Sequence, residues 1–140
     1  MSRKKILTAI DGSQFSESIV DKAIEYAKLF DAEIILVYCH RKFPTTVVQP
    51  FQEEKTAHII SESEKVVDPF LQQIRDSNIS VEDRIMEEPA GAVISDIARI
   101  EACDLIIMGS RGLTNIASLI IGSVTNRVLQ TAPCSVLVVR

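Results

Sequence analysis

Five short strand-like runs alternate with four segments of helical periodicity along the whole chain. The strand-like runs cover Lys5–Asp11, Glu33–Cys39, Ser80–Met86, Asp104–Met108 and Ser135–Val139. Apolar residues at three- and four-residue spacing between them predict helices over Ser16–Phe30, Glu53–Asp76, Ala92–Ala102 and Ser123–Gln130. Because strand–helix–strand units form parallel sheets with helices on both faces, the alternation predicts an open, five-stranded, Rossmann-like α/β fold.

The order of the strands decides where a ligand can bind. Right-handed crossovers restrict the possible topologies, and we expect the order 3-2-1-4-5 in the five-stranded sheet. In open α/β sheets, ligands bind beyond the carboxyl ends of the strands, where the winding direction reverses. We therefore expect a ligand crevice between the first and fourth strands.

Length and composition exclude several classes of protein. The 140 residues fit one domain, 1–140, and the net charge of −4 argues against nonspecific binding to nucleic acid or anionic membranes. No segment has the apolar length of a membrane span, and the N-terminus lacks the pattern of a signal peptide. The three cysteines, Cys39, Cys103 and Cys134, lie far apart without a C-x-x-C pair, as expected of reduced core thiols. These features predict a cytoplasmic protein.

Two local features qualify the helical pattern. Pro69 lies inside the second helical segment, where it removes one backbone hydrogen bond and crowds the carbonyl of Lys65, so we expect a kink or break. The connection before this helix, His40–Gln52, is long enough to act as a lid, although we interpret it as a surface loop. His40 follows the second strand at the edge of the expected site and could approach the ligand, although we interpret it as a surface-loop histidine. We expect His58 to be solvated on the long helix. The two histidines lack a cysteine or carboxylate at ligand spacing and do not predict a structural zinc site.

Three of the five glycines, Gly109, Gly112 and Gly122, lie in one stretch of 14 residues after the fourth strand. Glycine lets backbone N–H groups approach an anion without a Cβ in the way, and the helix beginning at Ser123 would add unpaired N–H groups and a positive dipole end. The stretch therefore predicts a phosphate site. It matches neither the Walker A pattern nor the G-x-G-x-x-G of dinucleotide folds.

The expected strand order brings Asp11, at the end of the first strand, next to this glycine loop. Ser110 and Arg111 would project from the loop, and the amides of Ser123 and Val124 would point at the anion. Each residue also has a structural interpretation, as a turn glycine, a helix N-cap or a carboxylate that caps the next turn. The functional interpretation of Asp11 is a hydrogen bond to a ribose hydroxyl or base amine, or a cation site, because a carboxylate repels phosphate.

Four segments of the chain closely resemble the universal stress protein family: residues 9–13, 104–112, 122–124 and 132–139. The most specific part is the G-x2-G-x9-G-[ST] spacing, which in that family marks the members that bind ATP. The resemblance covers the whole chain and implies a small cytoplasmic ATP-binding protein, usually a homodimer, that acts under stress. It departs from the family pattern at Ser135, where proline is usual, and in the loop 88–91, where the glycine is displaced to Gly91.

The resemblance also implies positions for the nucleotide. Asp11 and the backbone at Ala9 and Cys39 would lie around the adenosine. The residues that would line the ribose and phosphates are Met108, Gly109, Gly112, Gly122, Ser123 and Val124.

Three functional hypotheses follow. The first is a regulatory or sensor-like protein that binds ATP, or another adenine nucleotide, with or without Mg²⁺ and with little or no turnover. The second is a slow Mg²⁺-dependent nucleotide hydrolase that uses Asp11. The third is a dimeric interaction module whose site is vestigial. The run Ser135–Val139 would be a bare apolar edge strand, so we expect a homodimer through it.

Overall fold

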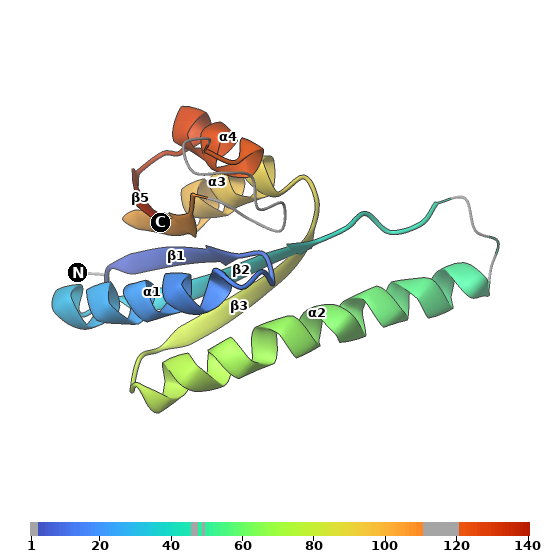
Figure 1. Cartoon of the computed structure of the whole chain (residues 1–140), viewed down its shortest axis with the longest axis horizontal. Coiled ribbons are helices and arrows are strands. Elements are labelled where there is room, and N and C mark those ends of the chain that lie inside the picture. Colours follow the sequence, from blue (N-terminus) through green and yellow to red (C-terminus); the bar gives the residue numbers. More distant parts are fainter. Residues whose placement is uncertain (1–2, 46–47, 49, 111–120) are drawn as a thin grey trace.

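The computed structural model describes residues 3–45, 48, 50–110 and 121–140. They form one parallel sheet of five strands in the order β3-β2-β1-β4-β5, with helices on both faces (Figure 1). The elements in chain order are β1 (Lys5–Ile10), α1 (Ser16–Phe30), β2 (Glu33–His40), α2 (Phe51–Asp76), β3 (Val81–Glu87), α3 (Ala90–Ile100), β4 (Leu105–Gly109), α4 (Ser123–Thr131) and β5 (Ser135–Val139). The predicted fold class and strand order are confirmed.

The core consists of two apolar layers separated by the sheet. Successive side chains of a strand point to opposite faces, so Ile6 and Ile10 of β1 pack with α1 and α2, whereas Leu7 and Ala9 pack with α3 and α4. The central strands are apolar on both faces, which explains why their sequences read as continuous apolar runs.

Most element boundaries agree with the predicted ones within two residues. The helix predicted over Ala92–Ala102 instead spans Ala90–Ile100, because Ala102 has a left-handed φ of 53° that no helix can include. The second helix begins at Phe51 rather than Glu53 and continues unbroken through Pro69, so the expected break is absent. Both Pro69 and Lys65 are exposed, and water can reach the carbonyl of Lys65 that the proline leaves without a partner.

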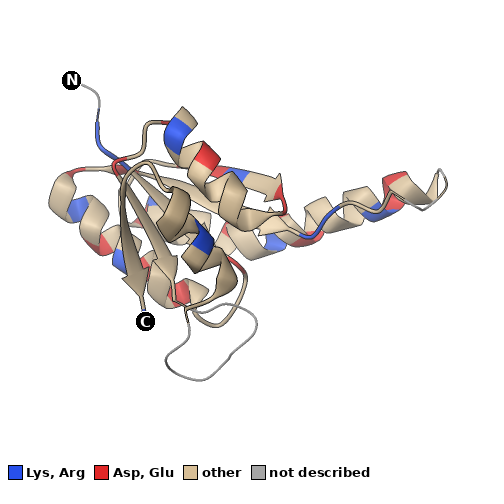
Figure 2. Cartoon of the chain, turned by 90° about the horizontal axis from the view of Figure 1, so that it is seen from above, with Lys and Arg blue, Asp and Glu red and all other residues tan. Residues whose placement is uncertain are grey.

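Helix α2 is longer than the sheet that it covers. Its buried positions are Ile59, Ser63, Val67, Leu71 and Ile74, and none precedes Ile59. The first turns of α2 therefore project away from the sheet, together with the chain segment that leads to them (Figure 1, Figure 2). Ile60, the residue after the first buried position, is 39% exposed.

The displaced glycine has a packing role. A Cβ on Gly91 would lie 2.7 Å from Cγ and 2.9 Å from Cβ of Arg127, closer than real Cβ atoms approach. Gly91 therefore allows α3 and α4 to pack closely. Arg127 is exposed, as expected, although the base of its side chain covers this glycine.

The described part of the chain carries both acidic and basic residues. Figure 2 shows segments of both kinds on its helices. Among the helices that the structure describes, none has the length and apolar character needed to cross a bilayer.

Thr8 of β1 offers a test of the core. It is fully buried opposite Leu36 and Ile107, and its Oγ1 has no hydrogen-bond partner among the described residues. Thr8→Val removes this unsatisfied hydroxyl at nearly constant volume, so we expect it to raise the free energy of unfolding by about 1 kcal/mol in urea denaturation. The matched control is Thr125→Val, which removes a hydroxyl that donates to the Gly109 carbonyl at 2.6 Å and should lower stability by about 1–3 kcal/mol. Destabilisation by Thr8→Val would contradict this view of the core.

Candidate functional site

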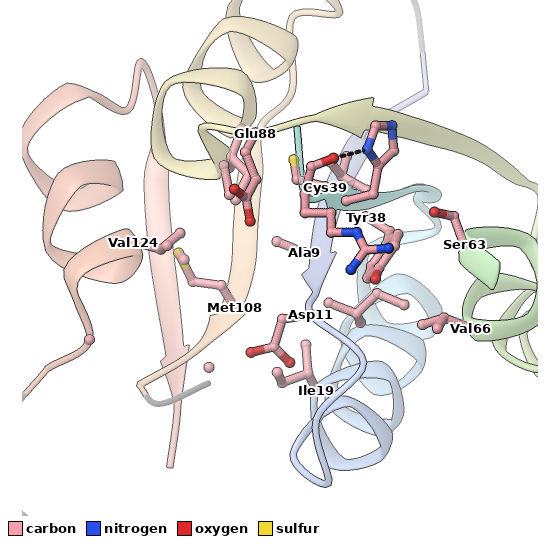
Figure 3. A pocket seen from close by; sticks show the side chains of 18 of the residues that line it. Ala9, Asp11, Ile19, Tyr38, Cys39, Ser63, Val66, Glu88, Met108 and Val124 are labelled. Atoms are coloured by element: carbon pink, nitrogen blue, oxygen red, sulfur yellow. Dashed lines mark hydrogen bonds between the residues drawn. The ribbon is translucent and has the colours of Figure 1, made fainter. Parts of the chain in front are cut away.

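A cavity of about 620 Å³ opens at the carboxyl edge of the sheet, within the usual size range of small-molecule sites (Figure 3). The ends of β1, β2 and β4 form its floor, and residues of α2, α3 and α4 form its walls. The predicted site residues that line it are Ala9, Asp11, Cys39, Met108, Gly109, Gly122, Ser123 and Val124. The structure therefore brings two distant parts of the sequence, around Asp11 and Gly122, to one hollow.

Of the other three predicted site residues, the structure describes only Ser110, which is not among the residues that line the cavity. Its backbone is engaged within the protein: its N–H donates to the Val139 carbonyl and its carbonyl accepts from Gly122, both at 2.9 Å. Arg111 and Gly112 lie outside the described residues, as does most of the apolar segment that follows them.

The amino end of α4 is fixed to the carboxyl end of β4. The hydroxyl of Thr125 donates to the Gly109 carbonyl at 2.6 Å, and the amide of Gly122 donates to the Ser110 carbonyl. Thr125 is 3% exposed, so its bond is shielded from water. These contacts hold the first turn of α4 beside the cavity, which Gly122, Ser123, Val124 and Thr125 all line.

This helix end has amide donors to offer. The N-cap of α4 is Gly122, which has no side chain to accept from the following amides, and no described residue accepts from the N–H groups of Ser123, Val124 or Thr125. Unpaired first-turn amides and the positive dipole end favour an anion at such a position.

The protein itself does not require glycine at position 122. Its φ of −59° is open to any residue, and the one described atom that a Cβ there would meet is the Ser110 carbonyl oxygen at 3.5 Å, an ordinary contact. Gly12, in contrast, has φ +78° and needs to be glycine for the turn after β1. Open space at Gly122 is what close approach of a ligand to the backbone would need.

Asp11 caps the turn after β1 with one carboxylate oxygen and lines the cavity as well. Its Oδ1 accepts from the Ser13 amide at 2.9 Å and from the Ser16 hydroxyl at 3.5 Å, so this oxygen caps the turn into α1. Its Oδ2 has no hydrogen-bond partner in the described part of the chain. The side chain lies in the middle of the cavity, between Met108 on one side and Val66 on the other (Figure 3).

A second carboxylate, Glu88, reaches the same cavity, and sequence reasoning missed it. Burial, followed by the negative charge of Glu88, raises the pKa of the Cys39 thiol to about 11. Burial, followed by the charge of Asp11, also raises the pKa of Tyr38. Cys39 and Tyr38 therefore stay protonated at neutral pH. Glu88 directly follows β3, whose carboxyl end lies at the same edge of the sheet as the cavity. The expected strand order could therefore have predicted that Glu88 lies near the site.

His40 does not lie on a surface loop, so its interpretation as a surface-loop histidine is wrong. It is the last residue of β2, only 5% exposed, because β2 and β3 pair as far as His40 and Glu87 and Phe43 covers the imidazole with a ring separation of 4.6 Å. Its Nδ1 lies 2.6 Å from the Arg41 carbonyl, and the ring lines the cavity. His58 is exposed, as expected, at the rim.

The cavity extends over both faces of the sheet. Ala9, Cys39 and Met108 belong to the layer under α3 and α4, whereas Ile10 and Tyr38 belong to the layer under α1 and α2. We call the first part the α4 lobe, lined also by Ala90, Ile94 and Val124. The second part is the α2 lobe, lined also by Ile19, His40, His58, Ile59, Glu62, Ser63 and Val66. Figure 3 shows Met108 and Val124 on the side of the α4 lobe, and Ser63 and Val66 on the other.

Sequence reasoning found the α4 lobe and missed the α2 lobe. The wall residues on α2 lie in an ordinary amphipathic pattern, which carries no local sign of a ligand. The three cysteines are free, as expected. No cluster of three His, Cys, Asp or Glu side chains suited to a metal ion occurs among the residues described.

Comparisons with known proteins agree with this geometry. The universal stress protein family matches residues 2–140. A Thermus aquaticus protein, the universal stress protein in the QAH/OAS sulfhydrylase 3′ region, is 33% identical over 139 residues, which cover 98% of each chain. The solved structure of the hypothetical protein MJ0577 superposes with a TM-score of 0.87 at 29% identity, covering 99% of this chain and 96% of that one.

Several solved structures with the same fold contain adenine nucleotides. A universal stress protein in complex with cAMP has a TM-score of 0.75 at 19% identity, covering 100% of this chain and 99% of that one. An Arabidopsis thaliana family member with AMP bound has a TM-score of 0.71 at 16% identity, covering 97% and 90%. At these identities the likeness shows the fold alone. The family match along nearly the whole sequence, supported by the Thermus relative, means that this chain belongs to the universal stress protein family.

Proposed function

We propose that this protein binds ATP in the α4 lobe and acts in the cytoplasm as a regulatory or sensor-like stress protein with little or no turnover. The observation that carries the proposal is the pairing of an uncapped α4 amino end with a glycine at which, among the described residues, a Cβ would meet only the Ser110 carbonyl oxygen. The amides of Ser123 and Val124 would hold the phosphates. The adenosine would lie toward Ala9 and Cys39, on the apolar floor beside Met108.

Two further observations support an adenine nucleotide. Family members of the same fold are solved with cAMP and AMP, and the G-x2-G-x9-G-[ST] spacing is complete in this sequence. The carboxylates of Asp11 and Glu88 lie along the cavity away from α4, where they can accept hydrogen bonds from ribose hydroxyls or the base amine. Donors at one end and acceptors at the other would fix the direction in which the nucleotide lies.

A regulatory function agrees with the position of Asp11. Oδ1 of Asp11 accepts a hydrogen bond from the Ser13 amide and stabilises the turn into α1. This hydrogen bond fixes the position of the carboxylate. Gly112, which the family spacing implies, and Arg111, which could neutralise phosphate charge, remain part of the proposed phosphate site.

Gly122→Val tests the phosphate site. The γ-methyl groups would enter the space before the α4 amides, and each charge-assisted hydrogen bond lost costs about 1.5–3 kcal/mol, so we expect ATP affinity to fall by about 10- to 100-fold. Isothermal titration of nucleotide-stripped protein with ATP, with and without Mg²⁺, measures this effect.

The matched control is Asn126→Val, which lies exposed on the same helix and does not line the cavity. It should leave ATP affinity unchanged, and both variants should keep the melting temperature of the wild type. The proposal fails if wild-type protein gives no heat at high micromolar ATP, or if Gly122→Val binds ATP normally.

Slow hydrolysis is the second candidate function, favoured by the unbonded Oδ2 of Asp11 in the middle of the cavity. Such an oxygen can hold Mg²⁺, which prefers carboxylate and phosphate ligands. We expect no phosphate release above the uncatalysed rate when ATP and Mg²⁺ are incubated with the protein and the products are resolved by chromatography. Steady release that Asp11→Ala abolishes would replace the regulatory proposal with the hydrolase.

We also propose a homodimer through β5. Among the described strands, β5 pairs with β4 on one side only, and its apolar side chains from Val136 to Val139 are half-buried. An apolar edge of this kind is normally covered, and an antiparallel match with a second copy would cover it with two-fold symmetry.

Val138→Lys tests this dimer. Val138 is the β5 side chain between Leu137 and Val139 that belongs to neither core layer, so a lysine there should leave the monomer folded. We expect sedimentation to show a dimer for the wild type and a monomer for the variant. A monomeric wild type, or a variant that remains dimeric, would contradict the proposed interface.

A further inference from the structure

The α2 lobe has no part in the nucleotide site that the family pattern implies. Among the predicted site residues that line the cavity, Ala9, Cys39 and Met108 belong to the α4 lobe, and Asp11 lies between the lobes. The α2 lobe is nevertheless continuous with the same cavity, across the turn that follows β1. A ligand in the α4 lobe therefore has open space beside it.

The walls of the α2 lobe combine apolar and aromatic side chains with charged ones at the rim. Ile10 and Ile19 line it together with Val66 of α2, and Tyr38 contributes an aromatic ring. Arg41 and, on α2, His58 and Glu62 also line this side of the cavity. A Cβ on Gly12 would lie 3.4 Å from Val66 and 3.8 Å from the Tyr38 ring, so the turn after β1 packs directly against both. Walls of this kind suit a flat, largely apolar group.

Two buried polar side chains line this lobe and offer acceptors. A carbonyl oxygen can only accept, so the short contact with Arg41 assigns the proton of neutral His40 to Nδ1 and leaves a lone pair on Nε2. His40 is only 5% exposed, and its Nε2 has no hydrogen-bond partner among the described residues. Ser63, 2% exposed, donates its hydroxyl proton to the Ile59 carbonyl at 2.7 Å, which leaves its oxygen as an acceptor.

We propose that the α2 lobe is an accessory subsite for a second planar ring, bearing a hydrogen-bond donor, that is joined to the adenine nucleotide. The inference rests on the proposed nucleotide site in the α4 lobe. The apolar walls and Tyr38 take the faces of the ring, and His40 and Ser63 accept from its amino or amide group. The ligand class is thus an adenine nucleotide with a second aromatic group.

Two kinds of ligand carry such a ring. One has the ring on the ribose, which would lie near Asp11 between the lobes. The other has a second nucleoside at the far end of the phosphate chain, as in a dinucleoside polyphosphate. Their shared chemistry is the second ring, and the experiment separates the two sources.

The experiment compares three ligands by isothermal titration: ATP, ATP with an N-methylanthraniloyl ring on its ribose, and diadenosine tetraphosphate. We expect at least one of the ring-bearing ligands to bind about tenfold or more tightly than ATP, because the lobe would bury the apolar surface of the ligand's second ring. The ligand that shows the advantage identifies the point of attachment.

Ser63→Leu fills the lobe from α2 and should abolish the advantage of the ring-bearing ligand while ATP affinity stays within about twofold. Ser61→Leu is the matched control, because Ser61 is exposed on the same helix and does not line the cavity. It should retain the advantage. A second variant, His58→Trp, covers the lobe from its exposed rim and should act like Ser63→Leu without altering the core.

The possible failures are distinct. The subsite is refuted if neither ring-bearing ligand binds more tightly than ATP, or if the advantage persists in both Ser63→Leu and His58→Trp. If ATP gives no heat but a ring-bearing ligand binds in a manner that Ser63→Leu abolishes, the α4-lobe proposal fails and the α2 subsite stands. If no ligand binds, both proposals fail.

Discussion

The amino end of α4 is held against the carboxyl end of β4 by hydrogen bonds, and the whole candidate site depends on this attachment. Thr125 reaches back to the Gly109 carbonyl, and the Gly122 amide bonds to the Ser110 carbonyl. A helix dipole acts only within about one turn of the helix end, so a small displacement of α4 would remove its amides from the cavity. Glycine at position 122 is useful to a ligand only because these bonds place it beside β4.

The same attachment connects the site to the sheet edge. Ser110, whose carbonyl holds Gly122, also donates its amide to the Val139 carbonyl at the end of β5. One residue thus links the first turn of α4 to the strand that we propose as the dimer interface. Any shift of β5 that displaced Val139 would act on Ser110 and then on the amides offered to phosphate. A sensor-like function needs a physical path of this kind between ligand and partner.

Periodicity predicted the fold and the α4 lobe because both depend on local patterns. Strand and helix segments are legible from spacing, and Gly109, Gly122 and Ser123 form one short motif. The α2 lobe was missed because it depends on which face of α2 meets the sheet, a question of tertiary packing. His40 was misjudged for a related reason: pairing with β3 extended β2 by one residue and buried the imidazole. Gly91 departs from the family pattern in sequence, and the structure explains it by the close packing of α3 against α4.

The two lobes follow from strand geometry. At the end of β1, Ala9 faces the α4 lobe and Ile10 the α2 lobe, and at the end of β2, Cys39 and Tyr38 divide in the same way. Alternation along a strand makes this division unavoidable wherever a cavity crosses a sheet edge. Neighbouring residues in the sequence therefore line different parts of one cavity. In the arrangement that we propose, β4 and α4 hold the nucleotide, and α2 forms the wall of the space beside it.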